Sequence, residues 1–313
     1  MAAWTIKDIP DQSGRRAVIT GATGGLGFET ALALAGAGAS VIVTGRNDAR
    51  GAAVLARLRA IHPGADPRFA HLDVASLADI AAFADGLAAE GAPIDLLVNN
   101  AGVLALPTRR LTADGFEVQF GTNYLGHFAL TARLLPLLRR GDRARVVNLA
   151  SLVHRRGRIR FDDLMAERTY APWGAYAQSK LAMLVFAFEL QRRSDANGWG
   201  IASLAAHPGW ARTELFDKGP GADGRGGLAR RLIGLAAPFF SQSAAAGAWP
   251  VLFAATAAEA RAGEYYGPVG FQEFTGPPGP AFVAARARDP GLGARLWEAS
   301  EALTGVRFGD GAP

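Results

Sequence analysis

One tyrosine and one lysine, four positions apart, are the residues of this 313-residue chain best placed for acid–base chemistry. Tyr176 and Lys180 fall in a stretch, Trp173–Arg193, whose apolar residues recur with helical periodicity, so they lie one turn apart on one face. A nearby cation favours the ionised form of a phenol, whose pKa is about 10 when free. The pair therefore suits general acid–base work on a carbonyl or an alcohol. A solvated pair on an exposed helix is the alternative.

Composition and charge limit the class of protein. Half of the residues are hydrophobic, and there are no cysteines, which excludes disulfides and thiolate metal ligands. We expect no metal site. Residues 1–10 lack an apolar signal region and no long apolar run follows, so we expect no membrane span and a cytoplasmic location. The net charge of +5 comes from scattered arginines. With no nucleic-acid-binding module in the sequence, we attribute them to solvated helix ends and expect no nucleic-acid partner.

Short apolar strands alternate with helical segments and predict an α/β fold with a doubly wound, Rossmann-type parallel sheet. The expected strands cover residues 16–20, 40–44, 67–71, 94–98, 144–149, 201–205 and 264–266. The first expected helix follows the glycine-rich stretch and ends at about residue 36. The other expected helices cover residues 48–61, 77–89, 112–139, 174–193, 243–256 and 292–303. We expect helix 112–139 to bend at Gly121 or Gly126 and to be stopped by Pro136, and Gly276–Pro280 to form a loop.

The chain lacks a long linker, so we expect one domain over residues 1–313. Two segments, about 152–173 and 211–241, are candidates for a lid on the substrate side. Ligands of such sheets bind off the carboxyl ends of the strands, where this chain places its glycine and polar clusters. Gly21, Gly24, Gly25 and Gly27 separate the first strand from the first helix, where missing side chains let the backbone approach a pyrophosphate at the helix N-terminus. A plain tight turn is the alternative.

Together these motifs resemble those of the short-chain dehydrogenases/reductases. The matched features follow the family's order and are Thr20-Gly21-x3-Gly25-Leu26-Gly27, Asp73, Asn99-Asn100-Ala101-Gly102, Asn123, Ser151, Tyr176-x3-Lys180 and Pro208-Gly209-x3-Thr213. The subgroup looks like the retinol-dehydrogenase-like and WW-domain-oxidoreductase-like enzymes, by residues 121–128, 161–164, 206–209 and 296–298.

The resemblance implies a nicotinamide cofactor and a set of residues that bind it. Those residues are Gly21, Thr23, Gly24, Gly25, Leu26 and Gly27 at the pyrophosphate, Asp73 and Val74 at the adenine, Asn100, Ala101 and Gly102 at the ribose, and Tyr176, Lys180, Pro208, Gly209 and Thr213 at the nicotinamide end. Turn or cap roles are the alternatives for Asp73 and Asn100. The second strand is followed by Arg46 with no acid until Asp48, and an arginine can pair with a 2′-phosphate, so we predict NADP(H).

The resemblance also implies the catalytic roles. Tyr176 exchanges a proton with the substrate oxygen, Lys180 lowers the tyrosine pKa and binds the ribose, Ser151 hydrogen-bonds the same oxygen, and Asn123 holds a water. A strand-end cap is the alternative for Ser151, and a helix-interior amide satisfied by backbone is the alternative for Asn123. His127 and His154 lack a placed carboxylate and are left outside the catalytic set.

We expect an NADP-preferring carbonyl reductase or alcohol dehydrogenase for a small hydrophobic ketone, aldehyde or alcohol. Ser151, Tyr176 and Trp210 are the expected substrate residues, and the candidate wall residues are Leu104, Leu106, Phe161, Trp210, Leu215 and Phe216. The alternatives are a reductase of acyl-thioester, sugar or polyol substrates and a non-catalytic nucleotide-sensing module. Helices 112–139 and 174–193 are candidates for a homodimer face.

Overall fold

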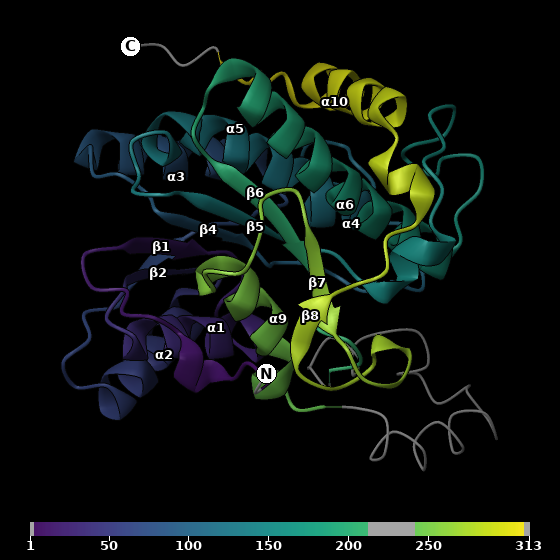
Figure 1. Ribbon diagram of the computed structural model, residues 1–313. Helices are drawn as coiled ribbons and strands as arrows, with labels where there is room; N and C mark the ends of the chain where they lie inside the picture. Colours follow the sequence, from purple (N-terminus) through teal and green to yellow (C-terminus); the bar gives the residue numbers. More distant parts are fainter. Residues whose placement is uncertain (1–2, 212–241, 310–313) are drawn as a thin grey trace.

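One eight-stranded sheet forms the centre of the computed structural model, which describes residues 3–211 and 242–309 (Figure 1). The strands lie in the order β3-β2-β1-β4-β5-β6-β7-β8, and each neighbouring pair is parallel except β7 with β8. Their bounds are β1 Arg16–Ile19, β2 Ser40–Gly45, β3 Arg68–His71, β4 Leu96–Asn99, β5 Arg145–Leu149, β6 Ala202–Ala206, β7 Tyr265–Pro268 and β8 Pro278–Pro280. The predicted doubly wound α/β fold is confirmed.

Helices cover both faces of the sheet. Their bounds are α1 Gly25–Gly36, α2 Asp48–Ile61, α3 Leu77–Glu90, α4 Val118–Phe120, α5 Gly126–Leu138, α6 Pro172–Asn197, α9 Ala244–Thr256 and α10 Pro290–Thr304. In Figure 1, α1, α2 and α9 lie on one side of the sheet, and α3, α5, α6 and α10 lie on the other. Each side has its own apolar cluster, so the central strands are buried on both faces and consist mainly of apolar residues.

The predicted start of the helix 112–139 is wrong, whereas its predicted end lies within one residue of the observed end. The helix begins at Val118, passes through the π-helical turn η2, Gly121–Leu125, and continues as α5 to Leu138. Pro136 lies inside α5 and does not stop it, because the one missing N–H falls in the last turn. The expected bend appears as the π turn between Gly121 and Gly126. A Cβ on Gly126 would lie 1.9 Å from the Val74 carbonyl oxygen, so this close packing requires glycine.

The predicted loop at Gly276–Pro280 is also wrong. Pro278–Pro280 pairs antiparallel with β7, with Gly279 opposite Gly267. Proline lacks an N–H and is rare inside sheets, but an edge strand tolerates it, and β8 is the last strand of this sheet.

We predict that Gly126→Ala lowers the free energy of unfolding by more than ~2 kcal/mol, because the new methyl group overlaps the Val74 carbonyl. Gly86→Ala is the matched control. Gly86 is an exposed glycine inside α3 with open space at its Cβ position, so alanine there should stabilise by ~0.5–1 kcal/mol. Urea unfolding of both variants measures the effects, and equal shifts would contradict the predicted packing constraint.

Candidate active site

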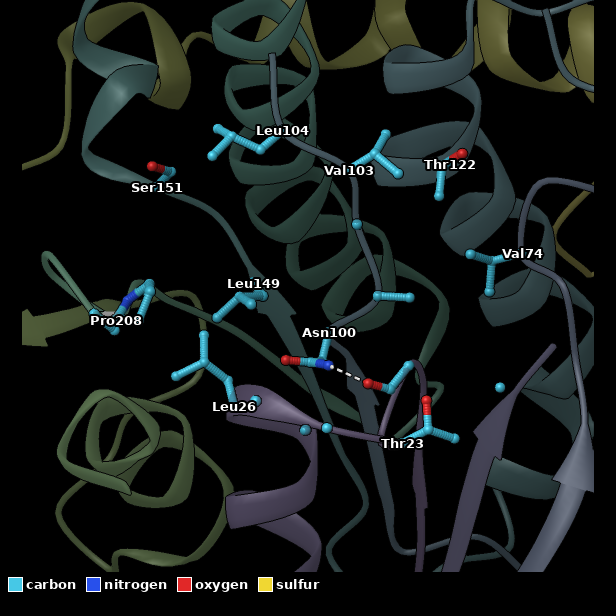
Figure 2. A pocket seen from close by; sticks show the side chains of 18 of the residues that line it. Thr23, Leu26, Val74, Asn100, Val103, Leu104, Thr122, Leu149, Ser151 and Pro208 are labelled. Atoms are coloured by element: carbon cyan, nitrogen blue, oxygen red, sulfur yellow. Dashed lines mark hydrogen bonds between the residues drawn. The ribbon is translucent and has the colours of Figure 1, made fainter. Parts of the chain in front are cut away.

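A pocket opens at the carboxyl ends of the strands and collects the predicted cofactor residues (Figure 2). Ser151 and Pro208 lie at one end of it, and Val74 and Thr122 lie at the other. Every predicted cofactor residue within the described ranges lines the pocket; Thr213 lies outside those ranges. The sequence did not single out several further lining residues, which are Gly45, Arg50, Leu72, Val103, Thr122, Leu149, Ala150 and Ala211.

The glycine loop between β1 and α1 fits the pyrophosphate of a dinucleotide. Gly24 is the N-cap of α1 and makes no side-chain hydrogen bond to the helix. A Cβ there would meet nothing within 4 Å, so the first N–H groups of the helix are open to a ligand in the pocket. Gly21 has φ +62°, which favours glycine, and a Cβ on Gly27 would lie 2.6 Å from Asn100 Nδ2. The residues present therefore suit an anionic ligand held by backbone.

Thr20 connects this loop to the end of β4, a role that the sequence did not reveal. Its buried Oγ1 accepts from Asn100 N (2.8 Å) and Ala101 N (2.9 Å). His127 Nε2 lies 2.9 Å from the same oxygen, and His127 Nδ1 lies 3.3 Å from the carbonyl of Asn123. Burial lowers the pKa of His127 to about 3, so the ring is neutral and serves as a fixed bridge. This agrees with leaving His127 outside the catalytic set.

Tyr176 is buried at the Ser151 end of the pocket. Burial raises the pKa of Tyr176 to about 12, while its hydrogen bond with Ser151 acts in the opposite direction. The Lys180 Nζ lies 5.9 Å from the centre of the Tyr176 ring. A lowering of the Tyr176 pKa by Lys180 stays a prediction.

Lys180 directs its ammonium group to the end of β5. Its side chain is buried, and Nζ donates to the Leu149 carbonyl oxygen at 2.8 Å. Burial lowers the pKa of Lys180 to about 8, so the group still carries its charge at pH 7. A Cβ on Gly102 would lie 3.7 Å from Nζ, so glycine there leaves space in front of the cation.

Asn123 lies in the π turn and uses its amide to hold backbone. Its Oδ1 accepts from Val103 N (2.7 Å), and its Nδ2 donates to Val103 O (3.0 Å) and to Ser179 Oγ (2.9 Å). The Asn123 amide therefore has backbone partners, as in the alternative interpretation of this residue. A water-holding role for Asn123 stays a prediction.

Arg46 and Asp73 stand at the other end of the pocket, beside Val74. The Arg46 side chain is 73% exposed and forms a long ion pair, 3.8 Å, with Asp73 Oδ2. Asp73 Oδ1 also accepts from Ala75 N. Asp73 therefore both stabilises a turn and lines the pocket. Arg46 is therefore accessible to an anionic group.

The expected substrate walls are only partly brought to the pocket. Among the described residues, Leu104 lines it, whereas Trp210 packs edge-on against Phe274 and does not. Phe161 packs with the core under the Arg295 guanidinium, and within the described ranges no residue of the segment 152–173 lines the pocket. Leu215, Phe216 and the second lid segment, apart from Ala211, lie outside the described residues.

The fold is of the Rossmann type, and its pocket, whose glycine loop suits an anionic ligand, brings Ser151, Tyr176 and Lys180 together. A sequence profile of the short chain dehydrogenase family matches residues 15–220, and the chain belongs to that family.

Named relatives and solved structures agree with this assignment. The chain is 41% identical to polyprenol dehydrogenase of Mus musculus, over 96% of this chain and 87% of that protein. It is 37% identical to retinol dehydrogenase 12 of Homo sapiens, over 94% and 88%. The crystal structure of an uncharacterized protein from Mycobacterium paratuberculosis matches with a TM-score of 0.80 and 38% identity, covering 98% of this chain and 99% of that one. The predicted family and its retinol-dehydrogenase-like subgroup are confirmed.

We predict that Lys180→Met raises the stability of the cofactor-free protein by ~1–3 kcal/mol at pH 7, because it removes a buried charge. Below about pH 8 the lysine is charged in both the folded and unfolded states, so the gain is largest there. Between about 8 and the ordinary value of 10.5 the folded lysine is neutral, and the gain shrinks. Melting temperatures of both proteins at pH 7 and pH 10 measure this. The control is Lys7→Met at an exposed site, and a gain that stays constant with pH would argue against the buried charge.

Proposed function

We propose that this protein is an NADP(H)-dependent oxidoreductase that transfers hydride between nicotinamide and a hydrophobic alcohol or its carbonyl, with Tyr176 as the general acid/base. The observation that carries the proposal is the placement of Tyr176, Lys180 and Ser151 together at one end of a pocket whose other end presents an accessible Arg46. A solved short chain dehydrogenase from Burkholderia cenocepacia in complex with NADP, 26% identical with a TM-score of 0.61, supports the choice of cofactor class.

A bound nicotinamide would supply or accept the hydride, and the chain's own residues manage the proton. Tyr176 gives its phenolic proton to the substrate oxygen in reduction and takes it back in oxidation. Ser151, hydrogen-bonded to Tyr176, is placed to donate to the same oxygen and to stabilise the charge that develops there. Lys180 keeps a buried positive charge beside the phenol, which favours its ionisation at the moment of proton transfer.

The substrate we propose is an apolar alcohol or carbonyl compound. Val103, Leu104, Leu149 and Ala150 line the pocket and favour an apolar partner over a sugar or polyol. Relatives named for polyprenol and retinol support the same class. Within residues 3–211 and 242–309, no helix is long and apolar enough to cross a bilayer. A cytoplasmic location and a homodimer stay predictions.

Tyr176→Phe should reduce turnover by about 10²–10⁴-fold while NADPH binding stays close to that of the wild type, since only the proton donor is removed. The assay follows NADPH absorbance with a panel of apolar aldehydes, ketones and alcohols. Tyr266→Phe is the control, because that hydroxyl bonds Arg261 N outside the pocket and its loss should leave turnover unchanged. Unaltered turnover in Tyr176→Phe would refute the catalytic assignment.

Arg46→Asp should lower the NADP-to-NAD ratio of kcat/KM by ~10–100-fold, because it replaces a cation that can pair with the 2′-phosphate by a carboxylate that repels it. Arg133→Asp makes the same change of charge on the exposed face of α5 and should leave the ratio as it is. Steady-state kinetics with both cofactors decide, and an unchanged ratio in Arg46→Asp removes Arg46 from the phosphate site.

A further inference from the structure

A buried histidine lies between β6 and the Pro208–Gly209 turn that borders the pocket. His207 is 0% exposed, and its Nδ1 accepts from Gly209 N at 3.1 Å. Its proton must therefore be on Nε2, which donates to Glu273 Oε2 at 3.0 Å. A Cβ on Gly267 would lie 1.9 Å from Nε2, so the ring is packed against bare backbone. The imidazole is held in one tautomer and one orientation.

The carboxylate that holds this tautomer is itself held from three sides. Besides His207, Glu273 Oε2 pairs with the Arg155 guanidinium at 2.8 Å, and Oε1 accepts from Phe282 N at 2.9 Å. Burial opposes ionisation of Glu273, but the His207 hydrogen bond and the Arg155 charge outweigh it and keep the Glu273 pKa below its ordinary value. Glu273 has φ +59°, a backbone conformation that residues other than glycine rarely adopt. These contacts keep it there.

The backbone beside Glu273 also lies against the turn. Trp210 N donates to Phe274 O at 2.9 Å, and a Cβ on Gly209 would lie 2.3 Å from that same oxygen. Arg155 belongs to η3, Leu152–Arg156, which follows Ser151 directly. Glu273 therefore connects the turn at one side of the pocket to the helix that follows the predicted catalytic serine.

We infer that His207 is a positioning residue for the nicotinamide end of the pocket. Its Nδ1 sets the Pro208–Gly209 turn, and Glu273 sets the imidazole tautomer that makes Nδ1 an acceptor. This inference rests on the proposed function for the role of the turn. His207 does not line the pocket and touches the cofactor only through the backbone that it shapes.

Two substitutions separate the turn from the contact with Glu273. An asparagine side chain can accept from the N–H two residues ahead, as Nδ1 of His207 does from Gly209, but it does not reach Glu273. His207→Ala loses both contacts. We expect His207→Ala to weaken NADPH binding about tenfold, and His207→Asn to restore it to within about threefold of the wild type. Both variants should show similar losses of melting temperature without cofactor. Binding is measured by tryptophan fluorescence, with His62→Ala as the control.

The outcomes are distinct. Equal NADPH affinities of His207→Ala and His207→Asn, or a His207→Ala affinity equal to that of the wild type, overturn the positioning role and leave the proposed function standing. A wild-type protein that binds neither NADPH nor NADH overturns the proposed function itself. If His207→Ala does not fold, ¹⁵N spectra of histidine-labelled wild-type protein decide, because a proton on Nδ1 would remove the acceptor and overturn the inference.

Discussion

The pocket is built around one ammonium group that stays charged inside the protein at a cost in folding stability. Lys180 is 4% exposed, and its Nζ donates to the carbonyl oxygen of Leu149 at the end of β5. Burying an amine disfavours its charged form, and the lowered pKa of about 8 shows how much of that cost remains. The carbonyl of a strand end is a suitable partner, since parallel strands direct their last carbonyls to the edge where ligands bind. The apolar residues of α6 hold the helix deep against the sheet and carry the Lys180 side chain to this strand end.

A second set of buried polar groups joins the neighbouring strands at the same edge. Thr20 accepts a hydrogen bond from the backbone N–H of Asn100, just after β4, and His127 lies between Thr20 and the backbone of the π turn. Asn123, in that turn, accepts from the backbone N–H of Val103. Buried polar atoms cost free energy unless they are paired, so these residues fix one another. The π turn is part of this arrangement because it brings the amide of Asn123 to Val103 while Gly126 passes the Val74 carbonyl. π turns of this kind often mark functional sites.

The elements that sequence predicts well are those whose signals are local. Helix Asp48–Ile61 begins after Asn47, whose side chain accepts from Arg50 N, and the predicted bounds are the observed ones. The doubly wound parallel sheet follows from the alternation of strands and helices and from right-handed crossovers. The start of the helix at Val118 and the strand Pro278–Pro280 depend on tertiary contacts and edge position, which have no local signal.

The site divides in the same way. Ser151, Tyr176 and Lys180 were predictable because they fall at strand ends or at helical spacing within a family pattern, and they line one pocket. Glu273 was not, because its partner His207 is 66 residues away and the hydrogen bond exists only after folding. The sequence also cannot show that Phe274 lies beside the ring of Trp210, which does not line the pocket, and a substrate role for Trp210 stays a prediction.

The C-terminal helix bears on how copies of this chain can associate. Trp297 of α10 lies 5.1 Å from Phe128 of α5 and 5.8 Å from Phe186 of α6, between ring centres, so it covers apolar side chains of the two helices that the sequence offered for a dimer face. The Arg193 guanidinium stacks over the same indole at 4.4 Å and is paired with buried Glu189. This part of α5 and α6 already has an apolar partner within the chain. A dimer built on it would have to pack against the outer surface of α10. The residues on that surface would then form the contact with the second copy.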